Sequence, residues 1–284
     1  ALLEQGRNFC NKLWNAYRLI SQWEVQSDDQ FSSEITKSNE LSNQWFTGKF
    51  NEAVNSIHQA FKEYRLSDAL MMTYKLIWDD FCSTYLEMVK PEYGKPINAT
   101  ALNQIKHHYE QALTLLHPFM PFITEELHHA MHNGTPKTDM ILNQFPLAVE
   151  QTIKVEDKAL SLVTEIRNTR NSKGISPKLP LDVIVKTEAV SDYLQWEYII
   201  KKLANIQNLN FNAAKPEQCI STLVGKEEVF IPYHEEINEE EEKKKREEEL
   251  AYLQGFLKSV EAKLNNEKFV ANAKPEVIEK ERQK

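Results

Sequence analysis

Apolar residues recur every three or four positions through the first half of the chain, as they do along one face of a helix. The first such face predicts a helix over about residues 4–22 and contains Phe9, Leu13, Tyr17 and Ile20. Further faces predict helices over about 41–64, over 67–90 with Ser67 as cap and Pro91 as stop, over about 99–117, and over 124–131. The polar stretch 26–39 indicates a loop, and Pro118 and Pro121 are expected to break the chain between the last two helices. This order of elements predicts an antiparallel helix bundle over residues 1–145.

The pattern changes after about residue 145. Helices are expected over 159–170 and 193–203, and short apolar runs predict strands over 181–186, 209–211, 220–224 and 229–233. The last two strands are joined by a turn through Gly225. Residues 146–236 are therefore expected to form a small α+β unit.

A third pattern begins at residue 237. A heptad seam of alternating three- and four-residue steps runs through Leu250, Leu253, Leu257, Val260 and Leu264. Pro275 can open a second helix after a turn at 265–267. Residues 237–284 are therefore expected to form a helical hairpin coiled coil with a short second arm, and the whole chain is predicted to be mainly α.

Composition narrows the class of protein. The 284 residues are 41% apolar and 27% charged, as in ordinary globular domains, and no apolar run approaches the length of a membrane span. The charged residues among the first twenty exclude a signal peptide, and three widely spaced cysteines suit reduced core positions. These features predict a cytoplasmic protein that does not bind a membrane.

The net charge of −8 argues at first against a nucleic-acid partner, but the charge is unevenly distributed. Residues 235–249 carry a local balance of −5, whereas residues 250–284 carry +2. The first helix is also basic, with Arg7, Lys12 and Arg18 against Glu4. Two basic surfaces on an acidic body suit a protein that touches phosphates at two places, although ordinary solvated faces would look the same.

Several strings are similar to valyl-tRNA synthetases. They are G-R-N-F-C-N-K-L-W-N-A-Y-R at 6–18, W-D-D-F-C-S-T-Y-L-E-M-V-K-P at 78–91, L-L-H-P-F-M-P-F-I-T-E-E-L at 115–127, I-R-N-T-R at 166–170 with K-L-P-L at 178–181, and N-E-K-F-V-A-N-A-K-P-E-V-I-E-K-E-R at 266–282. The resemblance covers essentially the whole chain. It implies that residues 1–145 are the anticodon-binding bundle of a class I synthetase. The hairpin favours the valine enzymes over the isoleucine enzymes, which usually end in a cysteine-ligated zinc module.

The resemblance implies that the first helix binds tRNA. Arg7, Asn11, Asn15 and Arg18 stand at steps of four, four and three, so they share one polar stripe. Such a stripe offers cations to phosphates and amides to the edges of unstacked bases. In the family this helix and the loop after it lie against the anticodon loop, and Trp23 could stack on a base. The alternatives are a solvated face for the stripe and a core aromatic for Trp23. Core positions are also expected for the other large aromatics of this region, Phe9, Trp14, Trp45 and Trp78.

The tip of the predicted hairpin carries Lys258, Lys263, Lys268 and Lys274. In the family such an arm leans on the outer corner of tRNA, where contacts with phosphates add affinity but little sequence information. Solubilising lysines are the alternative.

No catalytic group is predicted. The family signatures H-I-G-H and K-M-S-K-S are absent, so aminoacylation with ATP and Mg²⁺ is expected only of a longer parent protein. His128 and His132, four apart with Glu125 on the same side, suit a metal, but no third His or Cys ligand follows, and neither a metal nor another cofactor is predicted for this chain.

The favoured function is a tRNA-binding part of a valine–tRNA ligase that acts as a monomer on tRNA(Val) and not on DNA. The alternative is a non-catalytic helical scaffold that uses its coiled coil on a protein partner.

Overall fold

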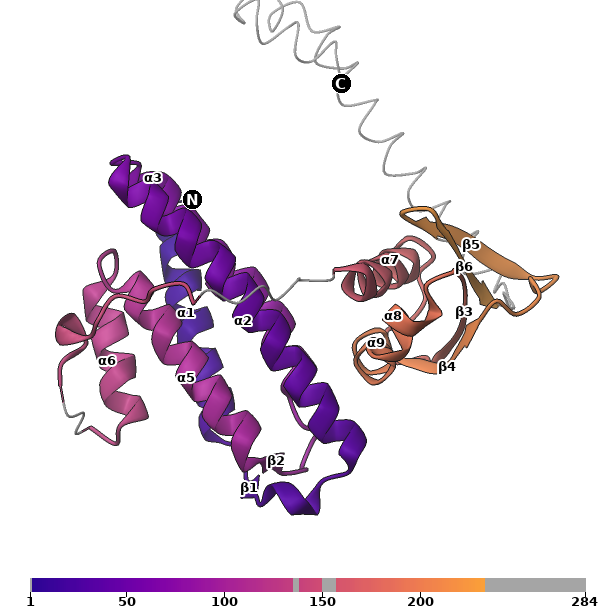
Figure 1. Ribbon diagram of the computed structural model, residues 1–284, viewed down its shortest axis with the longest axis horizontal. Helices are drawn as coiled ribbons and strands as arrows, with labels where there is room; N and C mark the ends of the chain where they lie inside the picture. The colour runs from indigo at the N-terminus through magenta and orange to yellow at the C-terminus, as the bar shows by residue number, and fades with distance from the viewer. Residues whose placement is uncertain (1, 135–137, 150–156, 233–284) are drawn as a thin grey trace, which may run out of the picture. The chain divides into compact units, whose positions relative to one another are not determined.

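The first half of the chain forms a bundle of long helices (Figure 1). The computed structural model describes residues 2–134, 138–149 and 157–232. Helix α1 spans Leu2–Ser21, and its apolar residues Phe9, Leu13 and Ile20 are buried while Tyr17 is half-buried. The helix predicted over 4–22 is thus confirmed.

Helix α2 spans Ser33–Lys62 and begins about eight residues earlier than predicted. The Ser32 hydroxyl caps it by accepting the Ile35 N–H at 3.3 Å. Two polar residues of the stretch that was expected to be a loop are buried in the bundle. The Ser38 carbonyl accepts a hydrogen bond from the Ser42 hydroxyl, and the Asn39 side chain donates to Asn98. The prediction of a loop is therefore wrong for residues 33–39.

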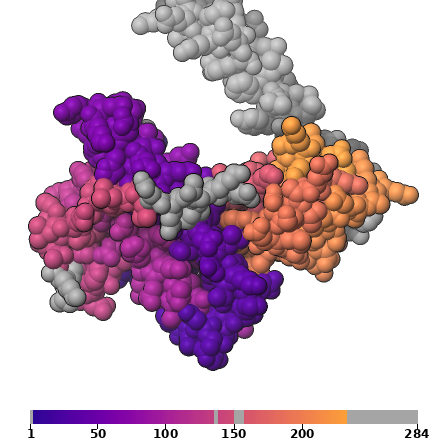
Figure 2. All heavy atoms as spheres, viewed as in Figure 1, coloured from indigo at the N-terminus to yellow at the C-terminus, as the bar shows by residue number. Residues whose placement is uncertain are grey.

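The third helix is continuous but changes its winding. It runs as α3 (Leu66–Lys75), a π-helical stretch η2 (Leu76–Tyr85) and α4 (Leu86–Val89), and it ends before Pro91 as predicted. Ser67 lies inside α3 and is not its cap, because the turn through Tyr64 lets the helix begin at Leu66. In Figure 2 the α2–α3 turn, in purple, stands out from the rest of the bundle, and Tyr64 there is 90% exposed.

Two more helices complete the bundle. Helix α5 spans Ala99–Leu116 and is capped by the Asn98 side chain, whereas α6 spans Pro121–Met131. Pro121 begins α6 and does not merely break the chain, because proline has no N–H to lose at a helix start. In the core, the buried Tyr109 hydroxyl donates to the Leu13 carbonyl at 2.8 Å and so ties α5 to α1.

The second half contains a four-stranded sheet with three helices on one face (Figure 1). The elements are α7 (Lys158–Ser172), β3 (Leu181–Lys186), α8 (Val190–Leu194), α9 (Glu197–Ala204), β4 (Ile206–Phe211), β5 (Cys219–Val224) and β6 (Glu227–Pro232). The strand order is β4-β3-β6-β5, with β3 parallel to β4 and the other pairs antiparallel. Gly225, at φ +60°, makes the predicted β5–β6 turn. The single helix predicted over 193–203 is wrong, because the chain breaks before the buried Trp196 into α8 and α9.

Arg170 holds this unit together from inside. Its guanidinium, 3% exposed, donates to four backbone carbonyls at 2.8–3.0 Å, those of Ser176, Leu179, Ala204 and Asn205. These bonds join the end of α7 to the chain before β3 and to the end of α9. Burial lowers the pKa of Arg170, and the carbonyl ring compensates the desolvated charge.

Lys202 of α9 makes a comparable contact with the helix bundle. Its ammonium donates to the carbonyls of Met88 and Lys90, each at 2.6 Å, at the end of α4. Burial lowers the pKa of Lys202 to about 8. Residues 1–232 form one compact unit that includes this contact.

The described residues are mostly helical with small sheets, which confirms the coarse prediction of fold class. The coiled coil predicted over 237–284 lies outside the described residues. Among the described helices, none is long and apolar enough to cross a membrane. The three cysteines are free, as expected, but only Cys82 has the predicted core position, since Cys10 and Cys219 are half-buried. Burial raises the pKa of Cys82 to about 12.

Candidate nucleic-acid interface

Helix α1 has one buried face and one polar face without partners. Arg7, Asn11, Asn15 and Arg18 are all exposed, as their spacing predicted. Within the described residues, none of these four side chains is held by a hydrogen bond or an ion pair. The stripe is therefore available to a ligand, and the only acidic residue of α1, Glu4, lies near its beginning.

Lys12 is the exception among the basic residues of α1. Its ammonium donates to the Ser83 hydroxyl at 3.3 Å and lies 5.1 Å from the centre of the Trp78 ring. Lys12 therefore belongs to the contact between α1 and η2. Phe9 and Trp45 are buried as expected, whereas Trp14 and Trp78 are only half-buried, so the assignment of these two to the core is correct only in part.

Trp23 lies two residues after the end of α1 and is half-buried. It precedes β1 (Val25–Gln26), which pairs in parallel with β2 (Ile97–Asn98), and the Ile97 N–H donates to the Glu24 carbonyl at 2.8 Å. Within the described residues no aromatic ring stacks on Trp23. The structure thus fixes the backbone around this indole and leaves part of its surface open.

The chain after Trp23 is fastened to the start of α5. A short 3₁₀ helix, η1 (Asp28–Gln30), places the Asp28 carboxylate where it accepts hydrogen bonds from the hydroxyl and the backbone N–H of Thr100. These bonds hold the pKa of Asp28 below its ordinary value. The segment that follows α1 is therefore pre-formed, which reduces the ordering cost of binding.

The structure adds Tyr93 and Lys95 to this region, and the sequence reasoning missed both. They lie in the loop just before β2, and both side chains are exposed, that of Tyr93 fully. Gly94, at φ +73°, allows the tight turn between them. A cavity of about 270 Å³ is lined by Lys95 of this loop, by Gln26 and Gln30 of the segment after α1, and by Lys202. The available signal was an aromatic residue and a lysine on a loop bounded by Pro91 and Pro96.

Lys106 of α5 was also missed. It is exposed, and with Tyr17 and Ser21 it lines a cavity of about 180 Å³ at the end of α1. No local pattern marks this residue, because its nearness to α1 depends on how α5 packs.

The remaining candidates divide into two groups. Lys258, Lys263, Lys268 and Lys274 lie outside the described residues. The grouping of Glu125 with His128 and His132 is wrong, because Glu125 lies with His129 and Asp139, while Glu110 of α5 lies with His128 and His132.

Comparison with known proteins identifies two parts of the chain. A family model described as the anticodon-binding domain of tRNA ligase matches residues 43–185. A second, described as the valyl tRNA synthetase tRNA binding arm, matches residues 238–284. Helix α1 lies before the first match, so the case for its stripe rests on the geometry.

Curated relatives named valine--tRNA ligase align with the whole chain. Identity is 39% over 287 residues with the protein of Christiangramia forsetii, 39% over 289 residues with that of Bacteroides thetaiotaomicron, and 40% over 287 residues with that of Porphyromonas gingivalis. Each alignment covers 100% of this chain and 32% of the relative, so the chain spans about a third of their length. The chain therefore belongs to the family of anticodon-binding domains of tRNA ligases, in its valyl-tRNA synthetase branch.

Proposed function

We propose that this chain is the tRNA-holding part of a valine–tRNA ligase and that α1 contacts the anticodon loop of tRNA(Val). The observation that carries the proposal is the α1 stripe, whose four polar side chains are exposed and without partners in a family defined by anticodon binding. Arg7 and Arg18 are eleven residues apart, so they stand about 16 Å apart along the helix. That separation spaces the two cations along several nucleotides, with the amides of Asn11 and Asn15 between them.

Aromatic side chains at the end of α1 complete the proposed surface. RNA loops are recognised largely by unstacked bases that stack on aromatic rings. Trp23 and Tyr93 lie on neighbouring segments joined by the β1–β2 pair, and Tyr93 is fully exposed. Lys95, near Gln26 and Gln30, and Lys106, near Tyr17 and Ser21, add positive charge.

The match of residues 238–284 to a tRNA-binding arm supports a second contact. In this proposal Lys258, Lys263, Lys268 and Lys274 touch phosphates at the outer corner of the tRNA. The chain would then divide into a bundle over 1–145, an α+β region over 146–236 and an arm over 237–284.

Catalysis belongs to the longer protein in this proposal. The H-I-G-H and K-M-S-K-S signatures of adenylation are not in this sequence, so activation of valine with ATP and Mg²⁺ would take place outside it. The relatives' names support a valine-specific ligase. We place it in the cytoplasm as a monomer.

Binding and catalysis can be tested separately. We expect the chain to bind tRNA(Val) more tightly than a non-cognate tRNA in a filter-binding assay at fixed salt. We also expect no valine-dependent exchange of pyrophosphate into ATP. Equal, weak binding of all tRNAs, or clear valine-dependent exchange, would contradict the proposal.

A further inference from the structure

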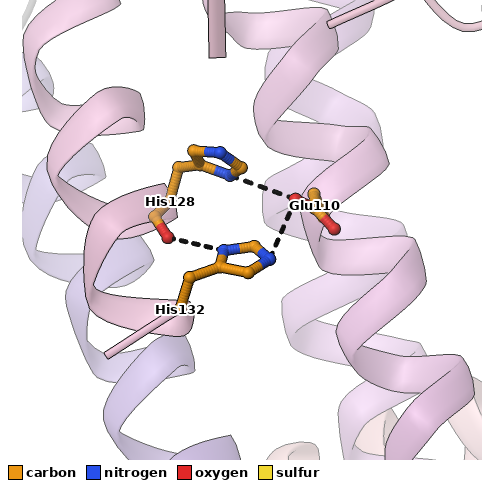
Figure 3. A group of neighbouring side chains, drawn as sticks. All are labelled: Glu110, His128 and His132. Carbon is orange, nitrogen blue, oxygen red and sulfur yellow. Dashed lines mark hydrogen bonds and ion pairs between the residues drawn. The ribbon is translucent and has the colours of Figure 1, made fainter. Parts of the chain in front are cut away.

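Three side chains from α5 and the end of α6 converge on one point (Figure 3). Glu110 projects from α5, His128 projects from α6, and His132 is the residue that directly follows α6. One carboxylate oxygen of Glu110, Oε1, lies 3.0 Å from Nδ1 of His128 and 3.7 Å from Nε2 of His132. The three atoms all lie within 4.8 Å of one another.

The hydrogen bonds of the ring nitrogens that do not face Glu110 indicate the tautomers of both histidines. Nε2 of His128 lies 3.0 Å from the Thr138 carbonyl, and Nδ1 of His132 lies 2.9 Å from the His128 carbonyl. A carbonyl can only accept, so each of these nitrogens carries a proton. In the neutral rings the nitrogens that face Glu110 therefore carry lone pairs.

This arrangement leaves three acceptor atoms facing one another. His128 is 4% exposed, and its Nδ1 makes no hydrogen bond although it points at the carboxylate. An ionised carboxylate is also acceptor-only. An unprotonated nitrogen that faces a carboxylate in a buried place is unfavourable, so the site favours a positive charge between these atoms, carried by a proton on His128 or by a metal ion.

We propose that Glu110, His128 and His132 bind a divalent transition-metal ion, best fitted by Zn²⁺. Zinc bonds of about 2.0–2.2 Å in a tetrahedron place the ligand atoms about 3.4 Å apart. The observed 3.0 and 3.7 Å lie on either side of that value. The third pair of ligand atoms is Nδ1 of His128 and Nε2 of His132. A small rotation of the partly exposed His132 would bring these two nitrogens to the same separation.

The surroundings match what a zinc site requires. Metal-bound histidines donate their other N–H to a carboxylate, a backbone carbonyl or water, and both imidazoles here have a carbonyl in that role. Two imidazoles and one carboxylate favour zinc over magnesium or calcium, which prefer oxygen ligands. Glu110 and His132 are 31% and 39% exposed, so water can reach the fourth position. The bound ion would clip α6 to α5.

A neighbouring cluster provides the matched control. Glu125, His129 and Asp139 also gather, but this group offers one imidazole. Both oxygens of Glu125 already lie 3.1 Å from the Met140 N–H, which donates to that carboxylate. His129 is 3.3 Å from Glu125 and 3.8 Å from Asp139. We expect this cluster to bind Zn²⁺ much more weakly.

The test uses the whole chain, stripped of metal with a chelator and titrated with Zn²⁺ by calorimetry. We expect one tight site per chain and a rise in the melting temperature at saturation. His132→Gln and Glu110→Gln should each weaken that site by at least about tenfold, as even outer-shell losses do at such sites. His129→Gln should leave it unchanged. Because His132 and Glu110 are partly exposed, these variants should melt like the wild type without metal.

Co²⁺ provides a second readout that depends on the ligands. The wild type should give the absorption bands of tetrahedral Co²⁺ without a thiolate charge-transfer band, and His132→Gln should lose them. The proposal is overturned if the chain has no saturable one-to-one site. It is also overturned if His132→Gln and Glu110→Gln bind Zn²⁺ as tightly as the wild type, or if His129→Gln loses the same site.

Discussion

Each cation of the α1 stripe stands alone at the surface, so its removal should affect binding and not folding. We expect Arg7→Ala and Arg18→Ala each to weaken tRNA binding while the melting temperature stays nearly constant, since exposed changes of this kind alter stability by less than about 0.5 kcal/mol. Loss of one phosphate contact should also reduce the slope of log affinity against log salt by about 0.7.

Lys226→Ala is the matched control for these variants, because Lys226 is exposed in the β5–β6 turn of the other half of the structure. If both arginine variants bind like the wild type at every salt concentration, the stripe does not contact RNA.

Two arginines of this chain have different roles because one is exposed and the other is buried. Arg7 is exposed, whereas Arg170 is buried in a ring of carbonyls, and both belong to strings that the sequence comparison singled out. The spacing of α1 was enough to predict that Arg7 is exposed. The role of Arg170 was not predictable, because its partners come from the loop before β3 and from the end of α9.

Between elements, the contact of α2 with α5 includes a buried histidine. His108 of α5 is 8% exposed and donates through Nε2 to Asn43 of α2 at 2.7 Å. Desolvation, with a smaller contribution from the charge of His107, lowers the pKa of His108 from its ordinary 6.5 to about 4. The folded state therefore keeps this ring neutral where the unfolded chain would protonate it.

The sign of the pH effect follows from proton uptake. Between about pH 6.5 and 4 the unfolded chain binds more protons at this position, so the stabilisation is complete above pH 6.5 and is lost as pH falls towards 4. The loss amounts to about 3 kcal/mol at most.

Urea unfolding of His108→Gln should depend less on pH in this range than that of the wild type. His107→Gln removes only the smaller contribution to the lowered pKa and should keep most of the wild-type dependence. Parallel pH profiles for His108→Gln and the wild type would refute the assignment.

Helix boundaries show the limits of local signals. Ser32 and Ser67 both precede apolar periodic segments, but only Ser32 caps a helix. The start of α3 is set by the Tyr64 turn, in which the Arg65 N–H donates to the Ala60 carbonyl at 2.8 Å. The π-helical stretch was likewise not predicted, because a wider turn changes the periodicity only slightly. Within it, Ser83 and Thr84 donate to the carbonyls five residues before them.

At the scale of the whole molecule, two separate RNA contacts should make the affinity for whole tRNA(Val) respond differently to truncation than the affinity for an anticodon stem-loop. The heptad pattern predicts a helix from about 237 to 264, which would reach about 40 Å at 1.5 Å per residue. An arm of that length cannot serve the nucleotides that α1 contacts. Linked contacts raise each other's effective concentration, so deleting residues 238–284 should weaken binding of whole tRNA(Val) and leave binding of an isolated anticodon stem-loop unchanged.

Charge reversal at Lys263 and Lys268 is the cleaner companion to that deletion, because it keeps the apolar seam intact. It should reproduce the same difference between the two RNAs. Equal losses for both RNAs would place the arm near the anticodon, and no loss for either would favour a protein partner.

The sequence by itself determined the long helices of the bundle, the four strands of the later sheet, the exposed stripe of α1 and the membership in the valyl-tRNA synthetase branch. These depend on local periodicity and on contiguous strings, which do not require knowledge of how the elements pack. Only the tertiary structure decided which distant side chains meet. Glu110 is eighteen residues before His128, and the direction of the turn between α5 and α6 brings the two together, whereas helical spacing alone assigned Glu125 to that histidine. The same reason explains the pairing of β1 with β2 and the position of Arg170 in its carbonyl ring, because each depends on contacts between residues far apart in the chain.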